Sequence, residues 1–146
     1  LKKIYIYPVV KAIAEEMLQI DKNKHTIEVS TRDEQIRYIT DERLLHQVIT
    51  NLVSNAMKYS PEGSSITLSI ELIDELLHIT VKDSGIGISP EDLAKLFEPF
   101  HRGQNVENIQ GTGFGLAIVQ RTLELLGGSI EVRSEIGEGS EFIVKL

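Results

Sequence analysis

The sequence predicts a domain of the α+β class, a two-layer α/β sandwich in which three main helices cover one face of a mixed, mostly antiparallel sheet. Amphipathic helical patterns occur three times, at residues 9–20, 41–59 and 116–126. Short runs of alternating apolar residues lie between and after them, separated by tight polar turns, as is typical of antiparallel strand pairs.

The composition bounds what the chain can do. Its 146 residues are 41% hydrophobic, which is enough for one core and predicts a single domain over 1–146. The chain has no cysteine, which excludes disulfides and thiolate metal sites. A net charge of −7 argues against nucleic acid or an anionic membrane as a partner, so local donors must hold any phosphate ligand. Because the chain opens on Leu1 and lacks a membrane-length apolar run, we expect a fragment of a longer protein without direct membrane contact.

The first forty residues predict an extended segment, a helix and a strand pair. Residues 5–7 are expected to be extended up to Pro8, and 9–20 to form an amphipathic helix. Two alternating runs, 25–30 and 36–40, flank a charged turn and are expected to pair with each other.

The helix expected at 41–59 carries an unusual polar stripe. Asp41 is the predicted N-cap. On a helical wheel, the apolar positions fill one arc and four polar residues form a stripe directly beside it. The stripe consists of Gln47, Asn51, Asn55 and Lys58. Asparagine is a mediocre helix former, so this pair favours a cleft over a solvated face, although a solvated face remains an alternative, above all for Lys58.

The next informative stretch follows a predicted hairpin with strands at 66–72 and 76–81. It reads Asp83-Ser-Gly85-Ile-Gly87-Ile88. A carboxylate at a strand end followed by two glycines can hold a donor-bearing ring against bare main chain. Taken alone, an ordinary strand–turn–helix connection explains the stretch equally well. Ser89 then predicts the cap of a short helix with Pro90 at its first position.

Residues 98–110 show no periodicity, and a loop of this length is usually a functional lid or is disordered. It leads into Gly111-Thr-Gly-Phe-Gly-Leu116, where glycines open a helix and expose backbone N–H groups to a phosphate. A dinucleotide fingerprint is excluded, because no strand precedes these glycines and the position three after Gly113, which must be glycine, is Leu116. No P-loop occurs either. Two closing strands are expected at 129–133 and 140–145, around a turn at 137–139.

Four stretches in order resemble the N, G1, F and G2 boxes of sensor histidine kinases. They are Asn51–Tyr59, Asp83–Gly87, Phe97–Gly103 and Gly111–Leu116. From about Tyr5 to Leu146 the chain resembles the catalytic, ATP-binding domain of these kinases. This domain has the Bergerat-type fold of the gyrase/Hsp90/histidine-kinase/MutL ATPase superfamily.

The resemblance implies a role for each matching position. Asp83 would accept from the adenine amino group, Gly85 and Gly87 would let the ring approach, and Tyr59 would pack beside it. The nucleotide contacts would be completed by Ile88, Phe97, Gly111, Thr112, Gly113, Phe114, Gly115 and Leu116.

The resemblance also implies a catalytic set, in which Asn55 would hold Mg²⁺ through its amide oxygen and Asn51 would lie within reach of the metal shell. Lys58 would reach the phosphates, and Arg102 would meet the γ-phosphate.

Asn51 stands where ATP-hydrolysing members of the superfamily carry a glutamate, and an amide is no general base. An imidazole acceptor needs no base, so Asn51 favours histidine as the target. The resemblance places that histidine in a context that none of the four histidines here has; they are His25, His46, His78 and His101.

The implied partner is therefore a separate phosphoacceptor and dimerisation domain of the parent kinase, with a response regulator downstream. The fragment itself is expected to be cytoplasmic and monomeric, within a parent that can be membrane-anchored. The alternative from another class is a module that binds ATP or ADP and signals through its lid without catalysis.

Overall fold

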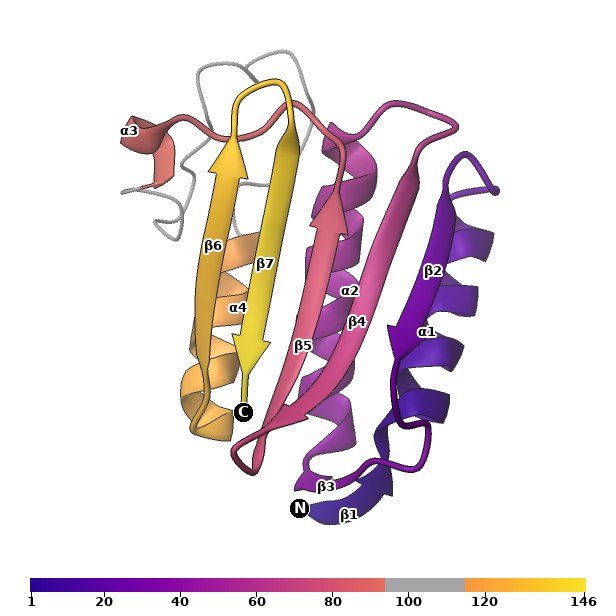
Figure 1. Ribbon diagram of the computed structural model, residues 1–146, viewed down its shortest axis with the longest axis vertical. Coiled ribbons are helices and arrows are strands. Elements are labelled where there is room, and N and C mark those ends of the chain that lie inside the picture. The colour runs from indigo at the N-terminus through magenta and orange to yellow at the C-terminus, as the bar shows by residue number, and fades with distance from the viewer. Residues whose placement is uncertain (94–114) are drawn as a thin grey trace.

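The computed structural model describes residues 1–93 and 115–146 (Figure 1). In chain order, its elements are β1 (Lys2–Tyr5), α1 (Ile6–Ile20), β2 (Thr26–Thr31), β3 (Arg37–Thr40), α2 (Glu42–Tyr59), β4 (Ser65–Ile73), β5 (Leu76–Asp83), α3 (Pro90–Leu93), α4 (Gly115–Leu126), β6 (Ser129–Glu135) and β7 (Gly139–Lys145). No helix within these residues is long and apolar enough to cross a membrane.

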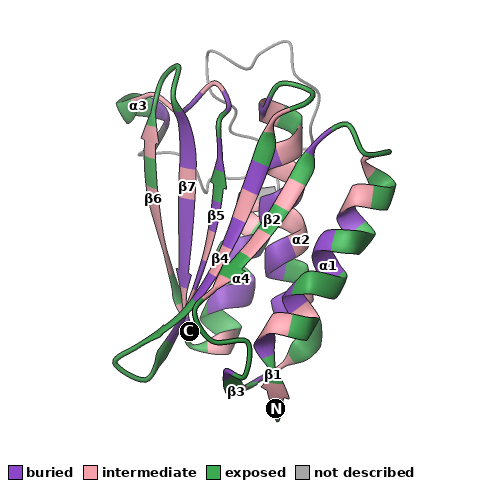
Figure 2. Cartoon of the chain, turned by 45° about the vertical axis from the view of Figure 1, so that its right-hand side comes forward, coloured by how far each residue is buried: buried purple, intermediate pink, exposed green. Residues whose placement is uncertain are grey.

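The predicted two-layer architecture is confirmed. One sheet has the strand order β2-β4-β5-β7-β6, in which β2 and β4 are parallel and the other neighbouring pairs antiparallel. Helices α1, α2 and α4 all lie against the same face of this sheet (Figures 1 and 2). The core fills the space between the two layers, as the buried stripes along the helices and strands show in Figure 2.

Local sequence signals account for the central helix. The Asp41 carboxylate caps α2 by accepting from the N–H groups of Arg43 (2.9 Å) and Leu44 (3.2 Å). The apolar arc of the helix is buried as expected, at Leu45, Val48, Ile49, Leu52, Val53 and Ala56. Gln47 of the neighbouring polar stripe contacts α4, where its Oε1 accepts from Thr122.

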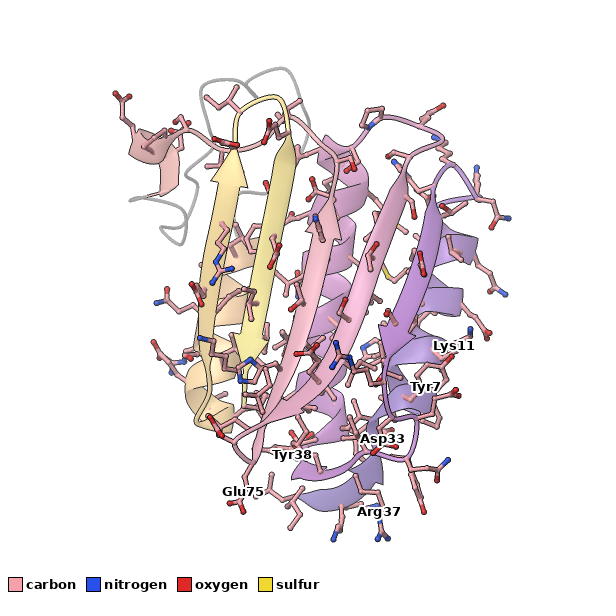
Figure 3. All side chains as sticks on the ribbon, in the orientation of Figure 1. Tyr7, Lys11, Asp33, Arg37, Tyr38 and Glu75 are labelled. Carbon is pink, nitrogen blue, oxygen red and sulfur yellow. The ribbon has the colours of Figure 1, made fainter. Side chains whose placement is uncertain are left out.

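The predicted pairing of 25–30 with 36–40 is wrong. Strand β2 instead runs parallel to β4, and β3 pairs antiparallel with β1 in a separate two-stranded sheet. Alternation shows that a segment is a strand but not which strand it joins. The partner of a strand depends on contacts between residues that are distant in the sequence. One such contact is the hydrogen bond that the Tyr38 hydroxyl donates to the Leu146 carbonyl; Tyr38 is labelled in Figure 3.

The first helix begins earlier than predicted, at Ile6 rather than at residue 9, so only Tyr5 of the expected extended segment is in a strand. Ile6 is completely buried, and its burial extends the helix toward the strand. Pro8 is tolerated because it lies in the first turn, where backbone N–H groups have no acceptor within the helix.

Both predicted hairpins are confirmed. The β4–β5 turn places Asp74 and Glu75 at positive φ (50° and 67°), as a two-residue hairpin turn requires. The β6–β7 turn lies at the opposite end of the sheet, beside the end of β5 (Figure 1). Ser89 and Asp92 also form the predicted cap of α3: the Asp92 N–H donates to Ser89 Oγ (3.2 Å), which donates to the Asp92 carboxylate (2.8 Å).

Candidate functional site

The candidate site lies at one end of the sheet, where the end of α2, the loop after β5 and the β6–β7 turn meet (Figure 1). The loop after β5, residues 84–88, is held on both sides by backbone hydrogen bonds. Ile86 N–H donates to the carbonyl of Tyr59 (3.3 Å), and the Ile86 carbonyl accepts from Gly137 N–H (2.9 Å). The loop that follows Asp83 is therefore joined by a backbone hydrogen bond to the end of the polar helix.

Asp83 is the last residue of β5 and is only 7% exposed. Its Oδ1 accepts from the N–H of Gly85 (2.8 Å) and of Ser140 (3.3 Å). Desolvation by burial raises the pKa of this carboxyl, while the two backbone N–H groups oppose the rise. Within residues 1–93 and 115–146, nothing donates to Oδ2. Asp83 thus has one oxygen fixed by the fold and one available to a donor.

The two glycines of this loop are required by close packing against protein backbone. A Cβ on Gly85 would lie 2.4 Å from the Tyr59 carbonyl oxygen, and one on Gly87 would lie 2.0 Å from that of Glu135. Only Gly87 has a positive φ (76°), so Gly85 is needed for space and Gly87 for both space and conformation. Whether these glycines also admit a ring remains a prediction.

The polar stripe of α2 divides into engaged and available side chains. Asn51 Nδ2 donates to the Gln47 carbonyl one turn earlier (2.7 Å), and Gln47 Oε1 accepts from Thr122 of α4 (3.4 Å). The half-buried Asn55 amide forms no hydrogen bond with the described part of the chain, and Lys58 is exposed. Asn55 is thus the stripe amide of which neither the oxygen nor the nitrogen is in a hydrogen bond with the described residues.

The remaining predicted site residues fall into two groups. Gly115 begins α4, and Leu116 packs half-buried against the core. Ile88, after the glycines, also packs against the core. The others lie outside the described residues, as does the expected lid at 98–110: Phe97, Arg102, Gly111, Thr112, Gly113 and Phe114.

The structure adds residues that the motifs do not contain. Gly139 has φ 117°, and a Cβ there would lie 2.2 Å from the Asp83 carbonyl oxygen. The Ser134 hydroxyl accepts from the N–H of Ile88, and the backbone N–H of Ser140 donates to Asp83, so the two serines hold the two ends of the Asp83–Ile88 segment. In the sequence these residues are typical of a surface turn and strand, and only the strand register brings them to the site.

His25 supports the end of α2 and is 5% exposed. Its Nδ1 lies 3.1 Å from both carboxylate oxygens of Asp21, and its Nε2 lies 3.0 Å from the Ser60 carbonyl oxygen. Since both neighbours are acceptors, the arrangement suits the doubly protonated ring. Burial lowers the pKa of His25, but the bonds to Ser60 and Asp21 outweigh it, and the pKa is raised above its usual value.

Comparisons with known proteins agree with the geometry. Residues 40–146 match the family model described as histidine kinase-, DNA gyrase B- and HSP90-like ATPase. The chain is 41% identical over 107 residues to the histidine protein kinase DivJ of Caulobacter vibrioides, covering 73% of this chain and 18% of DivJ. It is 37% identical over 130 residues to the sensor histidine kinase WalK of Bacillus subtilis, covering 86% of this chain and 21% of WalK. The chain therefore spans about a fifth of the length of these relatives.

Solved structures of similar fold include a sensor histidine kinase. The mycobacterial sensor histidine kinase MprB superposes with a TM-score of 0.87 at 25% identity, covering 99% of this chain and 97% of the other. Full-length ShkA in complex with AMPPNP superposes with a TM-score of 0.84 at 31% identity, covering 99% of this chain and 30% of ShkA. The chain belongs to the histidine kinase-, DNA gyrase B- and HSP90-like ATPase family, within which it is a catalytic domain of the sensor histidine kinase type.

Proposed function

We propose that this domain binds Mg²⁺-ATP at the end of α2 and presents the γ-phosphoryl group to a histidine of a separate phosphoacceptor domain. The observation that carries the proposal is the division of the Asp83 carboxylate, with Oδ1 held by two backbone N–H groups and Oδ2 available within the described residues, together with the uncommitted amide of Asn55 about one turn before the end of α2. Residues 1–146 would then be one ATP-binding domain of a longer kinase.

The adenine end of the site follows from Asp83. A buried carboxylate oxygen is a strong acceptor for an exocyclic amine, and the bonds from Gly85 and Ser140 fix its direction before the ligand arrives. Guanine presents a carbonyl oxygen where adenine has its amine, so Asp83 would face an acceptor and reject that base. Tyr59, half-buried at the end of α2, would pack beside the ring, as the family motif implies.

The phosphate end follows from Asn55 and Lys58. The described residues contain no group of three or more His, Cys, Asp or Glu side chains able to enclose a metal. Mg²⁺ is usually held by one or two protein oxygens together with phosphate oxygens and water, which the Asn55 amide fits. When bound, Mg²⁺ neutralises charge on the triphosphate. Asn51 is one turn away, and Lys58 carries an exposed ammonium group.

The proposed roles of the other phosphate-binding residues rest on the family motifs. Arg102 would meet the γ-phosphate, where a fork of N–H donors matches the charge of the transferring group. The backbone from Gly111 to Leu116 would hold the phosphates at the start of α4.

Asn51 has no basicity with which to activate water, so the chemistry depends on the acceptor. A neutral imidazole nitrogen attacks the γ-phosphorus with its lone pair, the new P–N bond forms, and the bond to the β,γ-bridging oxygen breaks to release ADP. No proton has to leave the nucleophile before the attack. Asn51 therefore fits phosphorylation of a histidine better than hydrolysis.

Two of the three described histidines are held by other parts of the fold. His25 is buried between Asp21 and Ser60, and His46 Nε2 is 3.0 Å from Glu16 on the face of α2 away from the polar stripe. We therefore place the acceptor on another domain of the parent kinase, in the cytoplasm where ATP is available, with a response regulator receiving the phosphoryl group next.

Titration calorimetry with ADP, ATP and GDP, with and without Mg²⁺, tests the binding part of the proposal. We expect adenine nucleotides to bind, ATP more tightly with Mg²⁺, and GDP much more weakly. Equal affinity for ADP and GDP would contradict the role of Asp83. A nucleotide-binding module without catalysis would pass this test but would transfer no phosphoryl group to an acceptor domain.

A further inference from the structure

We propose that Ser134 is a positioning residue for nucleotide recognition, whose hydroxyl ties both ends of the Asp83–Ile88 segment to the β6–β7 hairpin. The inference rests on the proposed function, because it concerns how the base-recognising carboxylate is held. It gives the β6–β7 hairpin, which belongs to none of the four motifs, a direct part in the site.

The hydrogen bonds around Ser134 can be assigned without ambiguity. Ser134 Oγ lies 2.8 Å from Ile88 N, 2.9 Å from the Gly139 carbonyl oxygen and 2.8 Å from Ser140 Oγ. A hydroxyl has one hydrogen and two acceptor positions. Ile88 N–H can only donate and the Gly139 carbonyl can only accept, so the single Ser134 hydrogen points to Gly139. The Ser140 hydroxyl must then donate to Ser134, which fills all three positions of the Ser134 hydroxyl.

The strand register connects this hydroxyl to Asp83. Ser134 lies opposite Ser140 in the β6–β7 pair, and Ser140 lies opposite Asp83 in the β5–β7 pair. The three residues therefore form one row across three adjacent strands, on the same face of the sheet. Ser140 N–H donates to Asp83 Oδ1, and Gly139 lies against the Asp83 carbonyl. Ser134 thus holds the first residue of the segment, Asp83, through Ser140, and it holds the last residue, Ile88, directly.

Loss of the Ser134 hydroxyl should destabilise mainly the Asp83–Ile88 segment. Ser134→Ala would leave the Ile88 N–H, the Gly139 carbonyl and the Ser140 hydroxyl each short of a partner, and Gly139 and Ser140 are buried. Unsatisfied buried polar groups are costly, so the loop should relax toward other arrangements. The β6–β7 ladder itself depends on backbone bonds that the substitution does not touch.

The test compares Ser134→Ala with Ser134→Thr, which keeps the hydroxyl, and with Ser129→Ala. Ser129 lies on the same strand, is exposed, sits at the far end opposite Lys145 and has no side-chain hydrogen bond within the described residues. Calorimetry should show ADP binding weakened about tenfold in Ser134→Ala, the factor that corresponds to roughly 1.4 kcal/mol. The ratio of ADP to GDP affinity should also fall, because a misdirected carboxylate discriminates less. Ser134→Thr should restore most of both, and Ser129→Ala should change neither.

Amide hydrogen exchange without nucleotide gives a second, independent measurement. The Ile88 amide should exchange faster in Ser134→Ala, while Val132 and Phe142 in the β6–β7 ladder keep their protection. If Ser134→Ala does not fold, Ser140→Ala removes the hydroxyl that donates to Ser134 and leaves the backbone bond to Asp83. It should lower the ADP-to-GDP ratio in the same direction.

The outcomes separate this inference from the proposed function. A wild-type chain that binds no adenine nucleotide overturns the proposed function itself. A wild-type chain that binds ADP, with an unchanged affinity and base ratio in Ser134→Ala, overturns only the role of Ser134. An equal loss for ADP and GDP, or the same loss in Ser129→Ala, also overturns it, because either would be a general effect on the fold.

Discussion

At the scale of single residues, the Asp83 carboxylate holds the loop with one oxygen, and we propose that its other oxygen recognises the base. Its Oδ1 closes the turn at Gly85 and binds β7 at Ser140, and its Oδ2 remains available within the described structure. This division allows a substitution that affects recognition and leaves the turn intact.

Asp83→Asn should weaken ADP binding strongly with little effect on folding. The amide Oδ1 can still accept from Gly85 and Ser140, but Nδ2 would place a donor against the adenine amine, a mismatch of about 1–3 kcal/mol. Calorimetry and thermal unfolding measure the two effects separately. Asp74→Asn, in the turn at the other end of the sheet, is the control. Unchanged ADP affinity in Asp83→Asn would mean that adenine binds elsewhere.

Asn55→Ala should remove the Mg²⁺ dependence of ATP binding and abolish phosphotransfer. Because the Asn55 amide has no hydrogen bond to the described residues, the substitution should remove the proposed metal ligand without breaking a hydrogen bond of the described fold. Thermal unfolding should therefore be nearly unchanged, as in Gln19→Ala, an exposed amide on α1. If Mg²⁺ still tightened ATP binding to the Asn55→Ala variant, another group would have to be the ligand.

His25 should make the stability of the domain depend on pH. The raised pKa means that the folded state holds the proton more tightly than the unfolded state, whose pKa is about 6.5. The stabilisation is complete below that pH and is lost as the pH rises through the folded-state pKa. The charged groups near the ring are Asp21, which accepts from it, and Glu62, which pairs with Lys24 at 3.8 Å.

Urea unfolding at pH 5.5 to 9 tests this dependence. The wild-type free energy of unfolding should decline across that interval, and His25→Gln should flatten the decline. His78→Gln, on the middle strand β5, is the matched control for replacing a histidine elsewhere in the described fold. An identical slope in His25→Gln would assign the pH dependence to other groups.

At the scale of elements, the sequence predicts what local interactions decide. The Asp41 cap, the buried arc of α2 and the β4–β5 turn follow from neighbours within a few positions, and all three are found as expected. The partner of β2 was mispredicted, because alternation cannot distinguish β3 from β4 as a neighbour. Ser134 was missed for the same reason, since its place beside Asp83 depends on the register of three strands.

For Gly85 and Gly87, the sequence indicates that glycine is needed, but it does not reveal that protein backbone packs against both residues. The motif suggests that Gly85 and Gly87 make room for a ring, whereas the structure shows both against protein carbonyls. Gly87→Ala should therefore destabilise the domain itself and impair ADP binding. Gly63 has a similar φ (86° against 76°) but nothing within 4 Å of a Cβ, so Gly63→Ala carries the conformational cost alone.

The difference between Gly87→Ala and Gly63→Ala isolates the clash of the β carbon with the carbonyl of Glu135. We expect Gly63→Ala to cost about 1–2 kcal/mol of unfolding free energy and Gly87→Ala clearly more. ADP binding should be lost only in Gly87→Ala. Equal destabilisation of the two variants would show that the loop does not depend on contact with the hairpin.

At the scale of the whole molecule, the sheet gathers at one end groups that are far apart in the chain. The end of α2, the loop after Asp83 and the β6–β7 hairpin are joined there by the bonds of Ile86, Ser134 and Ser140. Each sequence motif is weak alone, and the family order of all four made the family and the fold predictable, while the roles of the site residues stay predictions. The joining bonds are long-range, which is why sequence patterns do not reveal them.

The central claim is that this domain uses ATP to phosphorylate a histidine on another domain and scarcely hydrolyses it alone. The measurement that tests it most directly follows γ-labelled ATP with Mg²⁺, with and without the phosphoacceptor domain of the same kinase. We predict label on the acceptor histidine, none on this chain, and phosphate release by the chain alone far below about 1 s⁻¹, a rate on the low side for ordinary enzymes. Release at that rate without an acceptor, or an acceptor that stays unlabelled while ATP binds, would contradict the account.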